Sequence, residues 1–319
     1  MAKLVYGDMF FIDPLELDRS LRQLRQMYGG VSDELRGWNW SNDLLSPPLE
    51  GVYLGVSEIA NRYCPTYRDL YLRRVLGKAA PYTYKTVRGW IYHAISSRAV
   101  REVKSTLYRV GPCTGTRLQL LLSERKKEIL NSVFSEYGVE KHLGEHDALK
   151  LKRDAGALYD YLALQAAARL DRVLSETSRI PELESIIAKV VPMDAERLVD
   201  GRLLGLSREL RVDLFTERRI VVDIKTGDAR PFHKYTLAGY ALAIEADLEV
   251  PIDYGIISYL SVEDGVVKVR NSIHFIGDEL RREFIELRDE AFNIIHRGMD
   301  PGKPPKCPDY CIYYQVCNG

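Results

Sequence analysis

The chain has 319 residues, and its 45 lysines and arginines balance its 45 aspartates and glutamates to a formal net charge of zero. Hydrophobic residues make up 46% of the chain, which supports a large buried core and excludes a disordered protein. No apolar run approaches the roughly 18 residues of a membrane span, and residues 1–13 lack the pattern of a signal peptide. We therefore expect a cytoplasmic protein with no membrane partner.

The balanced charge is an average over unlike segments. Residues 56–130 hold 15 Lys and Arg against 5 Asp and Glu, a net charge of +10, and the other residues carry the opposite net charge. Seven tyrosines and Trp90 lie in the same basic segment. Because basic side chains neutralise phosphates and aromatic rings stack on bases, this segment is either a nucleic-acid-binding surface or a solvated helical face.

The first half of the chain has a helical pattern. Apolar residues recur at helical spacing, and the pattern is broken at residues 77–81 and 138–144. The predicted helices cover residues 14–28, 57–74, 83–108 and, as two or more helices, 115–177. We interpret residues 1–52 as an N-terminal extension and residues 53–180 as a helical part that contains Cys64 and His93.

Short β-rich runs follow Pro181. The predicted strands cover residues 186–191, 197–204, 210–215, 219–225, 254–260 and 266–275. The predicted helices of this half cover residues 231–246 and 278–296. The fold class is therefore mixed α/β (α+β), with an αβ core over residues 181–300 and a cysteine-rich tail over residues 301–319.

Two alternating runs on either side of Arg218 predict an antiparallel hairpin in which Asp213 faces Asp223 and Lys225 shares their face. The predicted apolar face holds Val212, Leu214, Val222 and Ile224. Carboxylates directly opposite each other destabilise a sheet unless a cation compensates them. A divalent metal such as magnesium or manganese would do so and would activate water for phosphodiester hydrolysis. The alternative is a surface hairpin whose aspartates are neutralised by Lys225 and nearby arginines.

A histidine on the helix predicted over residues 83–108 is a candidate metal ligand. His93 follows Gly89 by four residues, so both lie on one helical face, where glycine permits the close approach of another backbone. An imidazole ligand would shift the preference from magnesium toward manganese. The alternative is an ordinary packed or exposed histidine.

Three of the five cysteines, Cys307, Cys311 and Cys317, lie in the last 13 residues, a distribution that paired disulfides do not explain. Three closely spaced thiols suit a metal or iron–sulfur cluster that takes a fourth ligand from elsewhere. We favour Cys64 over Cys113 as that ligand, because Cys64 and Cys307 are both followed by proline. Zinc is the alternative occupant of a four-cysteine site.

The order of these motifs resembles one known family. A cysteine, a helical Gly-x-x-x-His, Val-Asp, Asp-x-Lys, a helix with Tyr240 and a terminal three-cysteine group follow one another between residues 56 and 317. This order is similar to that of RecB-like nucleases of the PD-(D/E)xK superfamily that carry an iron–sulfur cluster. Among them, the chain most resembles CRISPR-associated nucleases of the fourth Cas family, in the longer Csa-type archaeal variant.

The resemblance implies a RecB-like, restriction-endonuclease-type core and a set of site residues. His93, Asp213, Asp223 and the carbonyl of Ile224 would hold Mn²⁺ or Mg²⁺. Lys225 would be the catalytic lysine, and Tyr240 would contact nucleic acid. Cys64, Cys307, Cys311 and Cys317 would bind a [4Fe-4S] cluster.

The implied function is that of a metal-dependent DNA nuclease, a single-strand 5′-to-3′ exonuclease that processes spacer precursors in CRISPR adaptation. Its partners would be single-stranded DNA and the CRISPR integrase proteins, and a homo-oligomer is left open. Two alternatives remain: a non-catalytic DNA-binding subunit of the adaptation complex, and an iron–sulfur nuclease of recombination repair. The chain departs from the family pattern in two places. Thr236 replaces a glutamine, and the terminal cysteines are separated by three and five residues instead of two and five.

Overall fold

The computed structural model describes residues 4–6, 9–176 and 181–318. The helices of these residues are α1 Pro14–Met27, α2 Val56–Ala60, α3 Arg68–Arg74, α4 Tyr84–Val110, α5 Gly115–Glu136, α6 Val139–His142, α7 Glu145–Ser175, α8 Leu183–Val190, α9 Lys234–Leu248, α10 Asp278–Arg297 and α11 Tyr314–Asn318. The strands are β1 Leu4–Tyr6, β2 Met193–Val199, β3 Leu210–Thr216, β4 Val221–Lys225, β5 Tyr254–Glu263 and β6 Val266–Phe275. Short 3₁₀ helices are η1 Asp33–Leu35, η2 Gly37–Asn39, η3 Arg202–Leu204 and η4 Pro231–His233.

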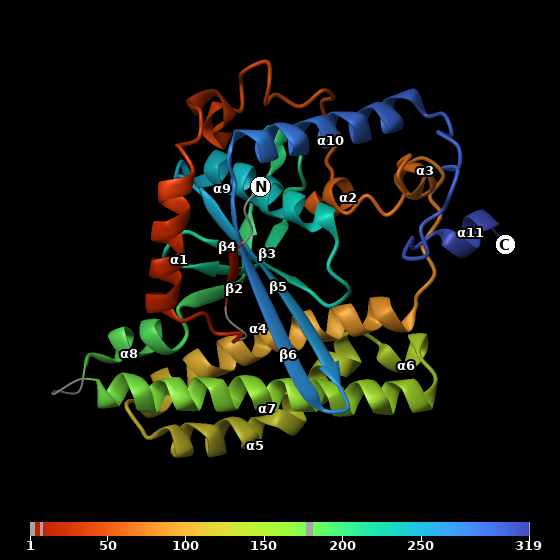
Figure 1. The fold of residues 1–319 in the computed structure, drawn as a ribbon. Helices are drawn as coiled ribbons and strands as arrows, with labels where there is room; N and C mark the ends of the chain where they lie inside the picture. Colours follow the sequence, from red (N-terminus) through yellow and green to blue (C-terminus); the bar gives the residue numbers. More distant parts are fainter. Residues whose placement is uncertain (1–3, 7–8, 177–180, 319) are drawn as a thin grey trace.

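The strands described here form one mixed sheet between two groups of helices (Figure 1). The strand order is β1-β6-β5-β4-β3-β2. β4 and β5 are parallel and are connected through α9, whereas the other neighbouring strands are antiparallel. α4, α5 and α7 lie on one side of the sheet, and α9 and α10 lie on the other. The mixed α/β class is thus confirmed.

Each side of the sheet has its own hydrophobic core. In the first core, the apolar stripes of α4, α5 and α7 pack with Leu214 and Ile224 of the sheet. In the second, α9 and α10 pack with Val221 and Ile257. Burying one leucine, isoleucine or phenylalanine side chain stabilises a fold by about 1.5–3 kcal/mol, so the two cores hold the β3–β4 hairpin firmly from both faces.

The N-terminal segment contributes to both cores. Phe11 and Leu24 are buried in the first core, and Leu35 and Leu45 are buried in the second. This segment therefore packs along the sheet and its helices. The division of the chain at residues 52, 180 and 300 remains a prediction.

Most predicted helices are confirmed, with one correction. α1, α4, α9 and α10 match their predicted ranges closely, and α5, α6 and α7 lie between residues 115 and 175. The single helix predicted over residues 57–74 is wrong, because α2 and α3 are separated by a loop. Arg62 and Tyr67 in that loop have φ values of +38° and +55°, which end the helix. The interruption turns Cys64 into a loop residue.

Two of the predicted strands need correction. Residues 186–191 lie mainly in α8, where Ile186, Ile187 and Val190 are buried at helical spacing. A short apolar run does not distinguish a buried strand from a helix, and here packing against α7 decides for the helix. The strand predicted over residues 197–204 begins earlier, at Met193, and ends at Val199, before η3. The other four predicted strands are confirmed.

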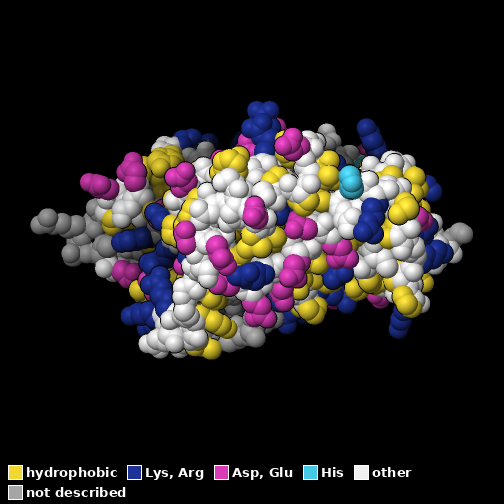
Figure 2. Space-filling view, turned by 90° about the horizontal axis from the view of Figure 1, so that it is seen from above, with side chains coloured by type: hydrophobic (Ala, Val, Ile, Leu, Met, Phe, Trp, Pro, Cys, Tyr) yellow, Lys and Arg dark blue, Asp and Glu magenta, His cyan; other side chains and the backbone are white. Residues whose placement is uncertain are grey.

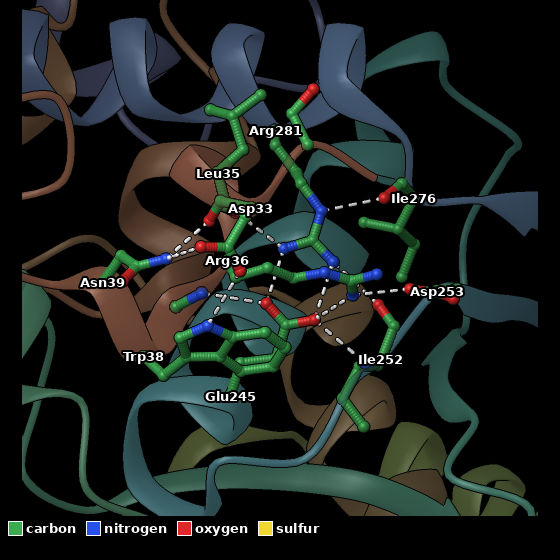
Figure 3. Close-up of polar contacts among 12 residues, drawn as sticks. Asp33, Leu35, Arg36, Trp38, Asn39, Glu245, Ile252, Asp253, Ile276 and Arg281 are labelled. Atoms are coloured by element: carbon green, nitrogen blue, oxygen red, sulfur yellow. Dashed lines mark hydrogen bonds and ion pairs between the residues drawn. The ribbon is translucent and has the colours of Figure 1, made fainter. Parts of the chain in front are cut away.

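A buried charge cluster connects the N-terminal segment with α9 and α10 (Figure 3). The side chain of Glu245 on α9 is fully buried and accepts hydrogen bonds from Arg281 at 2.7 and 2.9 Å and from Arg36 at 2.8 Å. The backbone N–H groups of Gly37 and Ile252 donate to the same carboxylate, each at 2.9 Å. A Cβ atom at residue 37 would lie 2.0 Å from a carbonyl oxygen of α9, so only glycine permits this approach.

α4 and α5 of the basic segment lie on the side of the sheet opposite the acidic helix α10, whereas α2 and α3 of the same segment contact α10. Figure 2 views the molecule from the side of α10 and shows acidic side chains across the middle of this face. α10 contributes six carboxylates there, none of them buried: Asp278, Glu279, Glu283, Glu286, Asp289 and Glu290. α4 and α5, on the other side of the sheet, belong to the basic segment and expose several lysines and arginines. None of the described helices combines the length and apolarity needed to span a bilayer.

Candidate active site

The β3–β4 hairpin has the predicted register. Leu214 pairs with Val222 and Phe215 pairs with Val221, and the same alignment sets Asp213 opposite Asp223. One residue of the predicted apolar face is wrong: Val212 lies in the second core, whereas Leu214 lies in the first.

The neighbouring strand β2 has a residue with positive φ at this point. Ala195 and Arg197 of β2 pair with Leu214 and Val212, and Glu196 between them has a φ of +52°. The β2–β3 ladder keeps one register on both sides of Asp213, and Val212 and Leu214 on either side of it pack in different cores.

α4 brings His93 to Asp213. His93 Nδ1 lies 3.1 Å from Asp213 Oδ1, and the backbone N–H of Ile224 donates to Asp213 Oδ2 at 2.7 Å. Burial opposes ionisation of both side chains, but each is the main opposite charge near the other. The pKa of Asp213 is therefore lowered, and the pKa of His93 is raised. The two side chains form an ion pair when His93 is protonated.

Gly89 of α4 lies close to the end of β4. A Cβ atom at residue 89 would lie 3.3 Å from Thr226 Oγ1, tighter than an ordinary contact. Arg88 of the same helical turn donates to the carbonyl oxygen of Thr226 at 2.7 Å. Since Thr226 follows Lys225, these contacts hold α4 against the end of β4 that carries the predicted catalytic lysine.

Asp223 and Lys225 form the second pair of the site. Lys225 Nζ lies 2.9 Å from Asp223 Oδ2, and both side chains are largely buried. Thr236 Oγ1 lies 3.3 Å from the same carboxylate but only 2.5 Å from the His233 carbonyl oxygen, and its one proton cannot serve both acceptors well.

Burial and the neighbouring charges shift the pKa values of Asp223 and Lys225 for different reasons. Burial, reinforced by the nearby charge of Asp213, raises the pKa of Asp223 although Lys225 opposes the shift. Burial also acts against the charge on Lys225, but Asp223 outweighs it and raises the pKa of the lysine. Lys225 therefore remains an ammonium group at neutral pH.

Two tyrosines border the carboxylates. Tyr240 lies one turn after Thr236 on α9, and burial together with the charges of Asp213 and Asp223 raises its pKa well above the usual value. It therefore keeps its O–H donor. Burial likewise raises the pKa of Tyr63, which lies within the electrostatic reach of Lys225 and Asp223. Tyr63 is not among the predicted site residues, and its position directly before Cys64 is its only local signal.

The donor chemistry of the site suits a hard or borderline divalent cation, because one imidazole and two carboxylates face a common region. Among the described residues, however, no three His, Cys, Asp or Glu side chains converge closely enough to hold a metal ion. Asp213 is engaged by His93 and the Ile224 amide, and Asp223 is engaged by Lys225. Metal binding would therefore require these side chains to exchange their present partners.

Two cysteines of the tail, Cys311 and Cys317, lie near Cys64. Cys64 is buried before α3, and Cys311 and Cys317 pack on the small cluster formed by Tyr71, Leu72 and Tyr313. Burial raises the pKa of Cys311 to about 11, and the charges of Cys64 and Cys317 act in the same direction. These three sulfurs therefore share one neighbourhood.

An arginine–aspartate pair ties this tail to α3. Arg68 donates to Asp300 through Nε and Nη2, each at 2.8 Å, and to Cys317 Sγ through Nη1 at 3.2 Å. Thr66 donates to the carbonyl oxygen of Gly302 at 2.8 Å and lies 3.3 Å from Cys64 Sγ. Cys113, in contrast, lies before α5 on the first core, where Arg117 and Asp171 are the charges that act on it.

Comparisons with known proteins identify one family over nearly the whole chain. A family model described as "CRISPR-associated exonuclease Csa1" matches residues 9–319. A CRISPR-associated exonuclease Csa1 of Saccharolobus solfataricus is 34% identical over 314 residues, which cover 97% of this chain and 100% of the relative. A second, from Thermoproteus tenax, is 35% identical over 308 residues, which cover 95% of this chain and 98% of the relative.

Proposed function

This chain belongs to the family of CRISPR-associated exonucleases described as Csa1, and from that premise we propose that the β3–β4 hairpin, α4 and α9 form the active site of a metal-dependent DNA nuclease. One observation carries the proposal. His93, Asp213, Asp223 and Lys225 come from three separate parts of the chain and meet as two adjoining pairs, one partly exposed and one largely buried. The hairpin with its Asp-x-Lys strand and α9 would be the centre of a RecB-like core.

The residues that would hold Mn²⁺ or Mg²⁺ are His93, Asp213, Asp223 and the carbonyl of Ile224. Such a cation, when bound, supplies Lewis-acid polarisation of a phosphoryl oxygen and lowers the pKa of an attacking water. The Ile224 amide orients Asp213, and Glu196, which has a positive φ, lies on the neighbouring strand. These groups are positioned before substrate arrives.

Lys225 and Tyr240 would act on the substrate directly. Lys225 is an ammonium group held at the site by Asp223, so it can neutralise charge that develops on the scissile phosphate. Tyr240 keeps its proton and can donate to a phosphate oxygen.

We assign a [4Fe-4S] cluster to Cys64, Cys307, Cys311 and Cys317. It would be structural, because a link between residues 64 and 307 closes a very long loop and constrains the unfolded chain. Visible absorbance and iron content should be lost in Cys311→Ser and retained in Cys113→Ser, its matched control. A colourless wild-type protein with stoichiometric zinc would contradict the assignment.

The proposed substrate is single-stranded DNA, degraded from the 5′ end during the processing of spacer precursors for the CRISPR integrase proteins. The family name and the basic segment with its aromatic residues support this choice. The test uses strands labelled at the 5′ or the 3′ end, with Mn²⁺ or with a chelator. Asp223→Asn should reduce cleavage about 100- to 1,000-fold, whereas Asp264→Asn, which changes an exposed carboxylate, should not. Wild-type cleavage by Asp223→Asn would refute the assigned site.

A non-catalytic DNA-binding subunit is the second candidate. It is favoured by the present pairing of Asp223 with Lys225 and by the lack of three converging metal-ligand side chains in the described residues. The same assay separates the two functions. Purified protein that binds the strand but leaves it intact in Mn²⁺ would support the binding role.

A further inference from the structure

Four aromatic rings form a cluster beside the proposed active site. The Tyr82 ring lies 5.4 Å from Trp90 and 4.1 Å from His142, measured between ring centroids. Trp90 in turn lies 6.1 Å from His142 and 6.4 Å from Tyr137. The rings come from the loop before α4, from α4 itself and from the α5–α6 region, so only the tertiary structure brings them together.

The cluster is open to solvent on one side. Tyr82 is 55% exposed although it contacts two other rings, and Trp90 and His142 are only partly buried. In contrast, aromatic residues of the hydrophobic core, such as Tyr92 and Tyr159, are buried. A tyrosine ring that is packed on one side and open on the other offers a free flat surface.

The cluster lies next to the proposed catalytic residues. Trp90 precedes His93 by three residues on α4, which places the two side chains about one helical turn apart. The charges of Glu196 and Arg211 act on the Tyr137 hydroxyl, and Arg211 lies two residues before Asp213. A nucleic-acid strand that reaches the hairpin from this side must pass the aromatic rings.

Positive charge flanks the rings. Lys85 on the first turn of α4 and Lys141 next to His142 are both exposed, and both can neutralise phosphates. Open aromatic rings between lysines are the usual elements of single-strand binding sites, since bases stack on the rings and phosphates contact the cations.

From these observations we infer that Tyr82, Trp90 and His142 form a stacking site for an unpaired base of the DNA strand that enters the active site. The inference rests on the proposed nuclease function and specifies its substrate further. In a duplex the bases cover one another, so the site selects single strands. Its role is to position the strand for cleavage at the hairpin.

Affinity measurements test the stacking directly. They use a ten-residue oligothymidylate, a chelator and the Asp223→Asn background, so that no cleavage occurs. Tyr82→Ala should weaken binding about tenfold, and Tyr82→Phe, which keeps the ring, should bind within about twofold of the parent. The control is Tyr108→Ala, because Tyr108 is similarly exposed (56%) at the far end of α4. Equal loss in Tyr82→Ala and Tyr108→Ala would overturn the inference.

Tryptophan fluorescence adds an independent readout. The chain has three tryptophans, and Trp38→Phe with Trp40→Phe leaves Trp90 as the single emitter. Oligothymidylate should quench Trp90, whereas an abasic strand of the same length and the corresponding duplex should not. Equal binding and quenching by the abasic strand would also overturn the inference. The stacking site and the nuclease function can fail separately. Cleavage is tested by Asp223→Asn, and stacking is tested by binding to Tyr82 variants without cleavage.

Discussion

Two buried carboxylates near α9, Glu245 and Asp223, have opposite surroundings. Glu245 receives five hydrogen bonds from two arginines and two backbone amides (Figure 3). Although burial opposes its ionisation, these donors outweigh it and lower the pKa of Glu245. Asp223 has one close cation, Lys225, and one shared hydroxyl, and its pKa is raised.

The difference separates a structural carboxylate from a reactive one. The hydrogen-bonding capacity of Arg281, the partner of Glu245, is also filled. The remaining N–H groups of this arginine donate to the carbonyl oxygens of Leu35, Ile252 and Ile276. A group whose hydrogen-bonding capacity is filled stabilises one arrangement of the chain. Asp223 and Asp213 retain unused capacity and repel each other, a cost that folds retain mainly where a ligand will compensate it.

The largest expected effect is on stability, in Glu245→Gln. The change leaves Arg281 and Arg36 without a carboxylate in a buried site and should lower the free energy of unfolding by about 3–5 kcal/mol. Denaturant unfolding followed by circular dichroism measures it, with Asp264→Asn as the exposed control. A loss below about 1 kcal/mol would show that the cluster is not structural. At acid pH, wild-type stability from this group should be present above about pH 4.5 and lost as the pH falls through the lowered pKa of Glu245.

Asp223→Asn should have a large effect on cleavage and a small effect on stability. Cleavage of single-stranded DNA should fall about 100- to 1,000-fold, or about 3–4 kcal/mol in activation free energy. Stability should change by only about 1 kcal/mol, because the loss of the Lys225 pair is offset by relief of burial and of repulsion from Asp213. Unfolding curves and initial rates on the same preparation provide the comparison. Severe destabilisation of Asp223→Asn would show that Asp223 is a structural carboxylate like Glu245.

Thr236→Val probes the weak donor to Asp223. The valine keeps the shape of the side chain and removes the hydroxyl that lies 3.3 Å from the carboxylate. Loss of one weak hydrogen bond of about 1 kcal/mol should reduce the cleavage rate about fivefold. The expected change in unfolding free energy is about 1 kcal/mol or less. Unaltered cleavage would show that Thr236 has no part in positioning Asp223.

The smallest effect concerns His93 in metal-free protein. Because its folded pKa is raised, the ion pair with Asp213 stabilises fully below about pH 6.5, and this stability is lost as the pH rises through the folded pKa. The side chain is 36% exposed, so solvent screening keeps the contribution below about 1 kcal/mol. Unfolding free energies between pH 6 and 8 should decline in wild-type protein and not in His93→Gln. Parallel curves would contradict this pairing.

Local patterns predicted much of the architecture. Periodicity identified the long helices α4, α7 and α10, because each buries one continuous stripe. It also identified the β3–β4 register, because the turn and the alternation of apolar residues constrain it together. Two predictions that concern helices were wrong. The helix α8 was predicted as a strand because packing decides its structure, and the break between α2 and α3 was missed because it depends on residues with positive φ.

By itself, the sequence determined the order of the motifs, the charge division and hence the family, since these are properties of the chain read along its length. Only the tertiary structure decided which charged residues meet. Nothing local distinguishes Glu245, with its full set of donors, from Asp223, or places Tyr63 near Lys225 and Tyr82 against His142. Burial and electrostatic pairing are set by contacts between residues far apart in the chain, and local periodicity carries no information about them.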